Sequence, residues 1–353
     1  TILDIYEVGG SHKFVKAPVQ PYFYSLKPMG KCTKVTKRFL SDLKKHTVYQ
    51  VFFKTTDALE MNRGTGTFED NLPYTQRVAI DLGFHCESEE PKPLAWDAES
   101  FPAGISPDPF KDKIRSLAAS SKFFAKGRQQ AIKAFLQHVK KYDPDVLVDY
   151  YGRFYDLPLL LVECHRLGMK CVLGRDGSEP YILKRVYERR GKGKQENIIR
   201  IGGRVHFDVH KRTQNDYTLT LAGLKSRGLN EVAQHFGLKP ITGVNHANIP
   251  DSRLEEVNYD DARCTYELAK IYLAIEYAIA ELLDIPLNMT LNRSPSHIAN
   301  FIYGRAFKKK DIISDAANYE RFPQIFQTGK RASQGAFVKC FQTGVFFDVT
   351  HKD

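Results

Sequence analysis

The feature that most constrains the fold of this chain is residues 94–99, where an apolar run leads into two carboxylates one residue apart. Side chains alternate between the two faces of a β-strand, so Asp97 and Glu99 would point to the same side if this run is a strand. Two carboxylates on one face can share a divalent metal ion. Surface strands also carry Asp-x-Glu pairs routinely, so only partners elsewhere in the chain can separate the two interpretations.

The residues that follow predict an α/β layer. Residues 129–141 place four apolar side chains at helical spacing, with cations on the opposite face. Pro144 lies where this helix should end, and residues 146–148 form a short apolar run suited to a buried strand. Residues 157–167 read as a second helix. This alternation of strand, helix and strand predicts a mixed α+β fold.

Composition narrows the class of partner. The chain has 52 Lys and Arg against 41 Asp and Glu, a net charge of +11 and an isoelectric point of about 9.2. Such a balance favours a polyanionic partner, most commonly nucleic acid, although ordinary basic enzymes reach it too. The six cysteines show neither zinc-site spacing nor a disulfide framework, which favours reduced thiols. No apolar run reaches the roughly 20 residues of a membrane span.

Domain boundaries are visible in the first half of the chain. The Glu/Pro/Lys stretch at residues 87–93 predicts a boundary near residue 94. Before it, residues 21–26 and 48–53 have the composition of strands, which predicts a mixed α/β module. After it, two β-rich runs flank a basic, glycine-containing stretch at residues 189–194, which predicts an exposed hairpin.

The longest helical pattern covers residues 254–283 and contains Asp260 and Asp261 near its start. Acids in the first turn of a helix are commonly explained by the helix dipole alone. The metal interpretation requires one of them to meet Asp97 and Glu99 in space.

Several segments, taken in order, resemble the amino-terminal half of an archaeal-type B-family DNA polymerase. They are the Asp-x-Glu strand, DPDVLVDYYGRFYDLPLL, the pair EPYILKRV and GRVHFD, and NYDDARCTYELAKIYL. QPYFYSL and FEDNLPYTQRVAIDLG are similar to that family's amino-terminal domain, and LNRSPSHIANFIYGRAF to the helices before its palm. The resemblance covers essentially the whole chain, and its specificity comes from the order of the segments.

The resemblance implies three domains. Residues 1–94 would be an amino-terminal template-binding domain that is discontinuous with a later segment. Residues 95–285 would form a ribonuclease-H-like 3′-to-5′ proofreading exonuclease. Residues 286–353 would be the helices and strand leading into the palm.

The resemblance also assigns a catalytic metal site. Asp97 and Glu99 match the family's first exonuclease motif, Asp156 matches the acid of the second, and Asp261 matches the acid of the third. Four carboxylates of this kind suit two divalent ions. Oxygen ligands without a His or Cys cluster favour Mg²⁺ or Mn²⁺ over zinc.

Contacts with primer–template and single-stranded DNA are implied at further positions. Pro21, Tyr22 and Phe23 would lie near the pocket that senses template uracil in archaeal members. The remaining expected DNA contacts are Tyr151, Arg153, Tyr155, Arg293 and Gly335.

Two departures from the family motifs motivate an alternative. Tyr151 stands where the second motif usually has Asn, and Val257 stands where the third usually has a Tyr that helps to hold the attacking water. Tyr259 lies two residues further along. A DNA-binding or structural subunit that no longer cleaves is therefore a second hypothesis, although it leaves the four acids unexplained.

The last residues bear on the polymerase activity of the family. Asp353 falls where the first palm carboxylate is expected, and the palm's later aspartates, the fingers and the thumb lie outside this sequence. We therefore do not expect these residues to add nucleotides alone: either the sequence is a fragment of a longer polymerase, or a second polypeptide completes the enzyme. A sliding clamp is a further candidate partner, no membrane partner is expected, and the expected location is cytoplasmic, with the nucleoid.

Overall fold

The structure is a computed structural model of the chain. It describes residues 2–6, 12–16, 20–39, 42–64, 66–70, 72, 74–86, 89–101, 104, 106–120, 122–124, 127–189, 192–214, 221, 223–292 and 295–313. The expected positions Arg293, Gly335 and Asp353 lie outside these residues.

The chain divides into two compact units, each discontinuous in sequence. The first comprises Thr1–Val19 and Thr75–Ala306, and the second comprises Gln20–Tyr74 and Phe307–Asp353. These divisions differ from the boundaries expected near residues 94 and 285. The second unit is discontinuous because the chain returns after its last helix and adds a strand to the sheet formed by residues 22–68.

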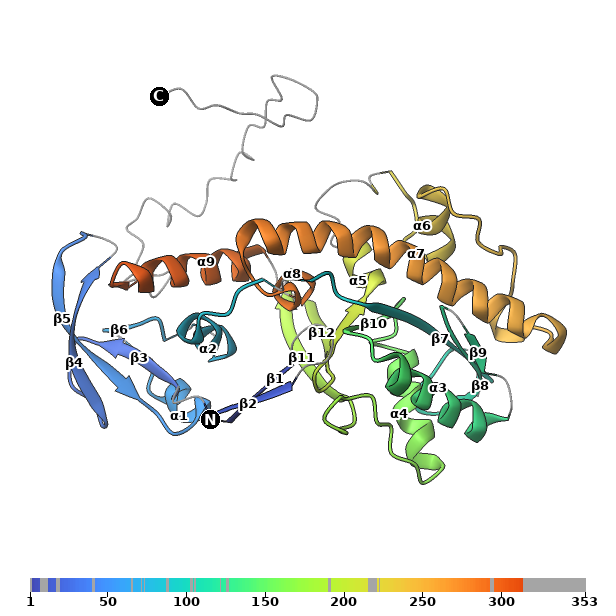
Figure 1. Ribbon diagram of the computed structural model, residues 1–353, viewed down its shortest axis with the longest axis horizontal. Helices are drawn as coiled ribbons and strands as arrows, with labels where there is room; N and C mark the ends of the chain where they lie inside the picture. Colours follow the sequence, from blue (N-terminus) through green and yellow to red (C-terminus); the bar gives the residue numbers. More distant parts are fainter. Residues whose placement is uncertain are drawn as a thin grey trace, which may run out of the picture. The chain divides into compact units, whose positions relative to one another are not determined.

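A five-stranded mixed sheet forms the centre of the first unit (Figure 1). Its strand order is β13-β10-β7-β8-β9, in which β10 runs parallel to both β7 and β13. Strand β8 is antiparallel to β7, and β9 is antiparallel to β8. The strands are β7 (Pro93–Phe101), β8 (Lys113–Ala119), β9 (Lys122–Phe124), β10 (Val146–Asp149) and β13 (Val205–Asp208).

Alternation along β7 separates a core from a polar face. Leu94 and Trp96 pack in one apolar cluster with side chains of α3 (Arg128–Tyr142) and α4 (Asp156–Arg166). The alternate residues Ala95, Asp97 and Glu99 face the other side of the sheet, where α7 (Asp251–Leu283) contacts β7 and β8. The predicted strand at residues 94–99 is therefore confirmed, and its two carboxylates lie on the α7 side.

The other predicted elements of this unit are present. The helix expected at residues 129–141 is α3, the strand at 146–148 is β10, and the helices at 157–167 and 254–283 are α4 and α7. The hairpin also forms: β11 (Tyr181–Arg189) pairs antiparallel with β12 (Lys192–Arg200).

The remaining elements of the first unit are short, apart from one long helix near its end. A two-stranded sheet joins β1 (Ile2–Tyr6) to β2 (His12–Lys16). The helices are α2 (Tyr74–Leu82), α5 (Val209–Gln214), α6 (Leu229–His235), the 3-10 helix η1 (His246–Asn248), α8 (Leu287–Asn292) and α9 (Pro295–Lys309). Tyr74 of α2 and residues 307–309 of α9 belong to the second unit. Among the described residues, no helix combines the length and the apolar character needed to cross a membrane.

The second unit is built on a five-stranded sheet of order β14-β4-β5-β3-β6. The strands predicted at residues 21–26 and 48–53 correspond to β3 and β5. The sheet comprises β3 (Tyr22–Ser25), β4 (Cys32–Phe39), β5 (Lys45–Phe52), β6 (Thr67–Phe68) and β14 (Ile312–Ile313), with helix α1 (Thr56–Met61) after β5. Its aromatic side chains are largely internal, as the full burial of Phe23 illustrates.

Candidate metal centre

Strand β7 presents two acids of the site. Asp97 and Glu99 are separated by one residue, so the pleat places both carboxylates on the face covered by α7. Glu99 is only 7% exposed. Because Trp96 fills the opposite face, the two acids cannot turn away from the site without losing the core packing of the strand.

Helix α7 supplies Asp261 from its interior. The helix begins at Asp251, so Asp260 and Asp261 lie in its third turn, and the helix-dipole explanation for acids in a first turn does not apply. The two neighbours have different partners. The Asp260 carboxylate accepts hydrogen bonds from the Ile241 backbone N–H at 2.7 Å and from Arg263 at 2.6 Å. Asp261 instead lies beside the acids of β7.

Asp156 begins helix α4 and is also buried. The turn before it brings Gly152 against Asp149, so closely that a Cβ at residue 152 would overlap the Asp149 carboxyl. The Leu157 backbone N–H donates to the Gly152 carbonyl at 3.0 Å. A residue without a side chain is therefore required at this point for the turn to deliver Asp156.

The acids interact electrostatically across these three elements. Burial raises the pKa of Asp97 well above its usual range, and the charges of Asp156, Glu99 and Asp261 raise it further. Burial also raises the pKa of Asp156, with further contributions from Asp149 and Glu99. Carboxylates that are buried and repel one another are stabilised by a cation between them. The four predicted acids are thus brought together, and their chemistry fits divalent metal ions.

The pKa of Asp261, the acid on α7, lies near neutrality. Burial raises the pKa of Asp261 to about 7, while His246 lowers it and Glu99 raises it. At neutral pH this carboxyl is therefore balanced between its protonated and charged forms.

His246, from η1, adds an imidazole that the sequence did not suggest. Its Nδ1 lies 3.1 Å from Glu99 Oε1 and 3.8 Å from Asp261 Oδ2. The hydrogen bond to Glu99 raises the pKa of His246, against the effect of burial. One ligand atom from each of these three residues lies within 4.8 Å of the others, a spacing compatible with one metal ion.

Asn258 is a second residue of the site that the sequence did not suggest. Its Nδ2 donates to Asp97 Oδ2 at 2.6 Å, and its Oδ1 accepts from the Ser116 hydroxyl at 3.2 Å. The spacing to Asp261 could have identified it, because residues three apart lie on the same face of a helix.

The position of the family's water-holding Tyr has a different role here. Val257 is 2% exposed and packs with Ile249 and Leu254 in an apolar cluster. Tyr259, two residues before Asp261, points roughly to the opposite side of α7, and its hydroxyl donates to the Ser120 carbonyl at 3.4 Å. Tyr259 therefore does not take the place of the missing Tyr.

The residues expected to contact DNA near Asp156 differ in accessibility. Tyr151 is exposed, has a left-handed backbone (φ 72°) and contacts His210 edge to face. Arg153 is buried and donates from Nε to Asp208 at 2.6 Å. The hydroxyl of Tyr155 bonds Ser100 and donates to Asp112 at 2.7 Å. DNA contact thus remains a prediction, and these internal bonds favour it for Tyr151 over Arg153 and Tyr155.

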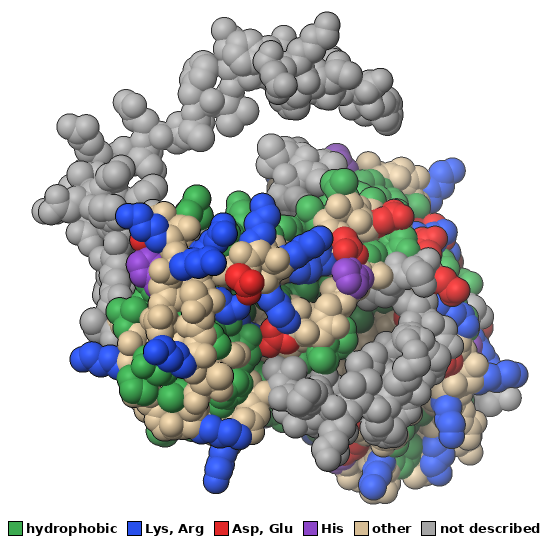
Figure 2. All heavy atoms as spheres, turned by 60° about the vertical axis from the view of Figure 1, so that its left-hand side comes forward, with side chains coloured by type: hydrophobic (Ala, Val, Ile, Leu, Met, Phe, Trp, Pro, Cys, Tyr) green, Lys and Arg blue, Asp and Glu red, His purple; other side chains and the backbone are tan. Residues whose placement is uncertain are grey.

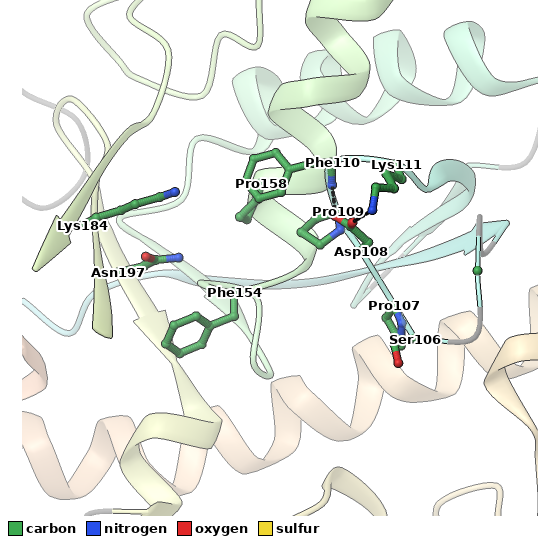
Figure 3. Close-up of a pocket in the computed structure, with 11 residues that line it drawn as sticks. Ser106, Pro107, Asp108, Pro109, Phe110, Lys111, Phe154, Pro158, Lys184 and Asn197 are labelled. Carbon is green, nitrogen blue, oxygen red and sulfur yellow. Dashed lines mark hydrogen bonds and ion pairs between the residues drawn. The ribbon is translucent and has the colours of Figure 1, made fainter. Parts of the chain in front are cut away.

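An open pocket of about 570 Å³ lies next to this turn (Figure 3). Phe154 and Pro158, two residues on either side of Asp156, form part of its wall. Lys184 and Asn197 reach it from the β11–β12 hairpin. The segment before β8 that contains Phe110 forms another part of the wall. The Lys184 ammonium lies 5.7 Å from the centroid of the Phe110 ring. Aromatic rings and a lysine in one pocket are features that suit single-stranded nucleic acid.

Comparison with known proteins shows which family the chain resembles. Residues 128–232 match the model of the exonuclease domain of DNA polymerase family B. The chain is 26% identical over 351 residues to a DNA polymerase of Thermococcus litoralis, covering 91% of this chain and 20% of that protein. It is 27% identical over 279 residues to a DNA polymerase of Pyrococcus glycovorans, covering 72% of this chain and 35% of that protein.

A solved structure agrees in fold. The family B DNA polymerase of the hyperthermophilic archaeon Pyrobaculum calidifontis aligns with a TM-score of 0.67 and 20% identity, over 88% of this chain and 48% of that one. The chain thus spans from about a fifth to less than half of the lengths of these polymerases. Together with the acids on β7, α4 and α7, the matches lead to one conclusion. The chain carries a family B DNA polymerase exonuclease domain.

Proposed function

We propose that the first unit is a metal-dependent 3′-to-5′ DNA exonuclease that removes nucleotides from the end of a single strand. The observation that supports this most strongly is the convergence of Asp97, Glu99, Asp156 and Asp261, from three elements, on one buried site. A mixed sheet with β8 antiparallel to β7 supports the ribonuclease-H-like assignment.

These four carboxylates would hold two Mg²⁺ or Mn²⁺ ions. When bound, such ions supply an activated water and stabilise the leaving 3′ oxygen, without a covalent enzyme intermediate. No ligand set of cysteines accompanies the acids among the described residues, where the five free cysteines are Cys32, Cys86, Cys164, Cys171 and Cys264.

Neighbouring polar residues would hold Asp97 in position to bind metal. Asn258 holds the Asp97 carboxylate from α7, and Ser116 in turn orients the Asn258 amide. Partners of this kind reduce the freedom of a ligand before the metal arrives. Asp97 would therefore meet the ions with little rearrangement.

The pocket lined by Phe154 and Pro158 would hold part of the single DNA strand. Its wall combines Phe110, Phe154 and Lys184. Aromatic faces stack on any base, and a lysine attracts the phosphate backbone, so this pocket would bind single strands without reading their sequence.

The second unit would contact the template through the exposed face of its sheet. Lys34 and Arg38 on β4 and Lys45 on β5 share one face by register and are exposed. Figure 2 brings β4 and β5 forward and shows more Lys and Arg than Asp and Glu side chains on the described surface. A uracil pocket at Pro21, Tyr22 and Phe23 finds less support, because all three are buried.

We place the chain within a DNA polymerase because its relatives are DNA polymerases. Its location would then be with the nucleoid. A second polypeptide and a sliding clamp are candidate partners on the resemblance alone.

The second candidate is a subunit that binds DNA without cleaving it, and the burial of Val257 favours it because no tyrosine hydroxyl is available there. Incubating the protein and Mg²⁺ with DNA labelled at either end separates the two. Exonuclease activity predicts single-nucleotide shortening from the 3′ end. Binding without shortening, with either Mg²⁺ or Mn²⁺, would overturn the proposal in favour of the second candidate.

A further inference from the structure

We infer that His246 is a nitrogen ligand of the metal site and shifts its preference from Mg²⁺ toward a first-row transition ion such as Mn²⁺. This inference rests on the proposed metal site and adds a ligand type that the four carboxylates lack. The geometry that supports it is the position of Nδ1, which faces both Glu99 Oε1 at 3.1 Å and Asp261 Oδ2 at 3.8 Å.

The loop that carries His246 is anchored on both sides. Val244 precedes it and Ile249 follows it, and both belong to the apolar cluster around Val257 on α7. Arg115 of β8 donates to the Ile249 carbonyl at 2.6 Å and also pairs with Asp251 at the start of α7. The imidazole is therefore presented to the acids by a loop held at several points.

Val257 connects this arrangement to the departure from the family motif. The resemblance expects a Tyr at this position, one helical turn before Asp261. Here the smaller Val257 provides the apolar contact for the loop. The loop in turn places His246 between Glu99 and Asp261. Val257, at the position of the family's Tyr, and His246 thus belong to one local structure.

The expected metal preference follows from the chemistry of the ligand atoms. Mg²⁺ prefers carboxylate and water oxygens and retains much of its hydration shell. Imidazole binds first-row transition ions more readily, and it binds as the neutral ring. For Nδ1 to bind the ion, the ring proton must lie on Nε2, and a proton held on Nδ1 passes to solvent.

Metal binding without DNA tests this directly. Mn²⁺ bound to the wild-type protein should show ¹⁴N coupling in pulsed electron paramagnetic resonance, and His246→Ala should remove that coupling. Mn²⁺ affinity should fall about tenfold in His246→Ala, as expected for loss of a ligand or its close partner. Mg²⁺ affinity should change much less. His246 lies on a half-exposed surface turn, and thermal unfolding will verify that the variant is folded.

A matched control is His165→Ala. His165 pairs with Glu179 at 3.1 Å and lies nine residues after Asp156 on α4, about 14 Å along the helix. Its loss should change neither affinity nor the ¹⁴N signal. Bound Mn²⁺ without ¹⁴N coupling in the wild type, or equal losses of Mn²⁺ and Mg²⁺ affinity in His246→Ala, would overturn the inference. Either result would leave the exonuclease proposal intact, whereas nitrogen-bound Mn²⁺ in a protein that cleaves no DNA would contradict the proposed function alone.

Discussion

The side-chain amide of Asn258 donates a hydrogen bond of 2.6 Å to the carboxylate of Asp97. This bond joins α7 to β7, the two elements that carry three of the four acids. Asn258 is fully buried, and its amide oxygen is itself held by Ser116 at 3.2 Å. The bond therefore fixes the distance between the acids of the strand and Asp261, which lies three residues further along the helix.

Asn258→Ala should weaken metal binding. The hydrogen bond from Asn258 lowers the pKa of Asp97, so its loss favours the protonated acid. We expect metal affinity to fall about 10- to 100-fold and the free energy of unfolding to fall by about 1 to 3 kcal/mol. Calorimetric titration with Mn²⁺ and urea unfolding measure the two effects. Asn62→Ala, which removes an exposed amide bonded to the Ala58 carbonyl, is the control, and an unchanged affinity in Asn258→Ala would refute the role.

Asp97→Asn should stabilise the metal-free protein. Burial and three neighbouring acids raise the pKa of Asp97, so the folded state binds its proton more tightly than the unfolded state. The cost of this charge is present at high pH and decreases as the pH falls through the raised pKa toward the ordinary value of 3.8. We expect a gain of about 1 to 3 kcal/mol at pH 8.

The measurement is the thermal unfolding midpoint in EDTA from pH 8 downward. The advantage of Asp97→Asn over the wild type should shrink as the pH is lowered. A lower midpoint for the variant at pH 8 would show that the charged Asp97 carboxylate does not destabilise the metal-free protein.

Metal affinity should depend on pH near neutrality. Asp261 has a pKa of about 7 without metal, with His246, Glu99 and Asp260 as its charged neighbours. Below that value a metal ion must displace a proton from the carboxyl, so affinity should fall by up to about tenfold per pH unit for each proton released. Titration at pH 6 and pH 8, in two buffers of different ionisation enthalpy, measures affinity and proton release. Equal affinities without proton release would contradict the expectation.

Gly152→Ala should disturb the turn that delivers Asp156. A Cβ there would overlap the Asp149 carboxyl, which is buried and bonded to His206 at 2.6 Å. We expect a loss of about 1 to 3 kcal/mol in the free energy of unfolding, together with weaker metal binding. Gly64→Ala is the control, because a Cβ at residue 64 would meet no atom within 4 Å. Similar behaviour of the two variants would argue against a special role for Gly152.

Much of the fold was predictable because its signals are local. Alternation along β7 placed Asp97 and Glu99 on one face, and helical periodicity located α3 and α7 to within a few residues. Asp261 could be proposed from its motif, but its burial depends on where α7 packs.

The parts that the sequence did not reveal depend on tertiary contacts. His246 lies in a turn without periodicity, and only the packing of its loop on Val257 brings it to Glu99. Arg153 was expected to contact DNA on the family resemblance. Its pairing with Asp208, 55 residues away, could not be read from its neighbours in the sequence.

The most direct test of the account compares two adjacent acids of α7 on single-stranded DNA labelled at its 5′ end. With Mg²⁺ or Mn²⁺, the wild-type protein should shorten the strand from its 3′ end, and Asp261→Ala should lose about a thousandfold or more of this rate. Asp260→Asn should retain the rate, because Asp260 bonds Ile241 and Arg263 and not the other acids. Cleavage that persists in Asp261→Ala at the wild-type rate would contradict the central claim.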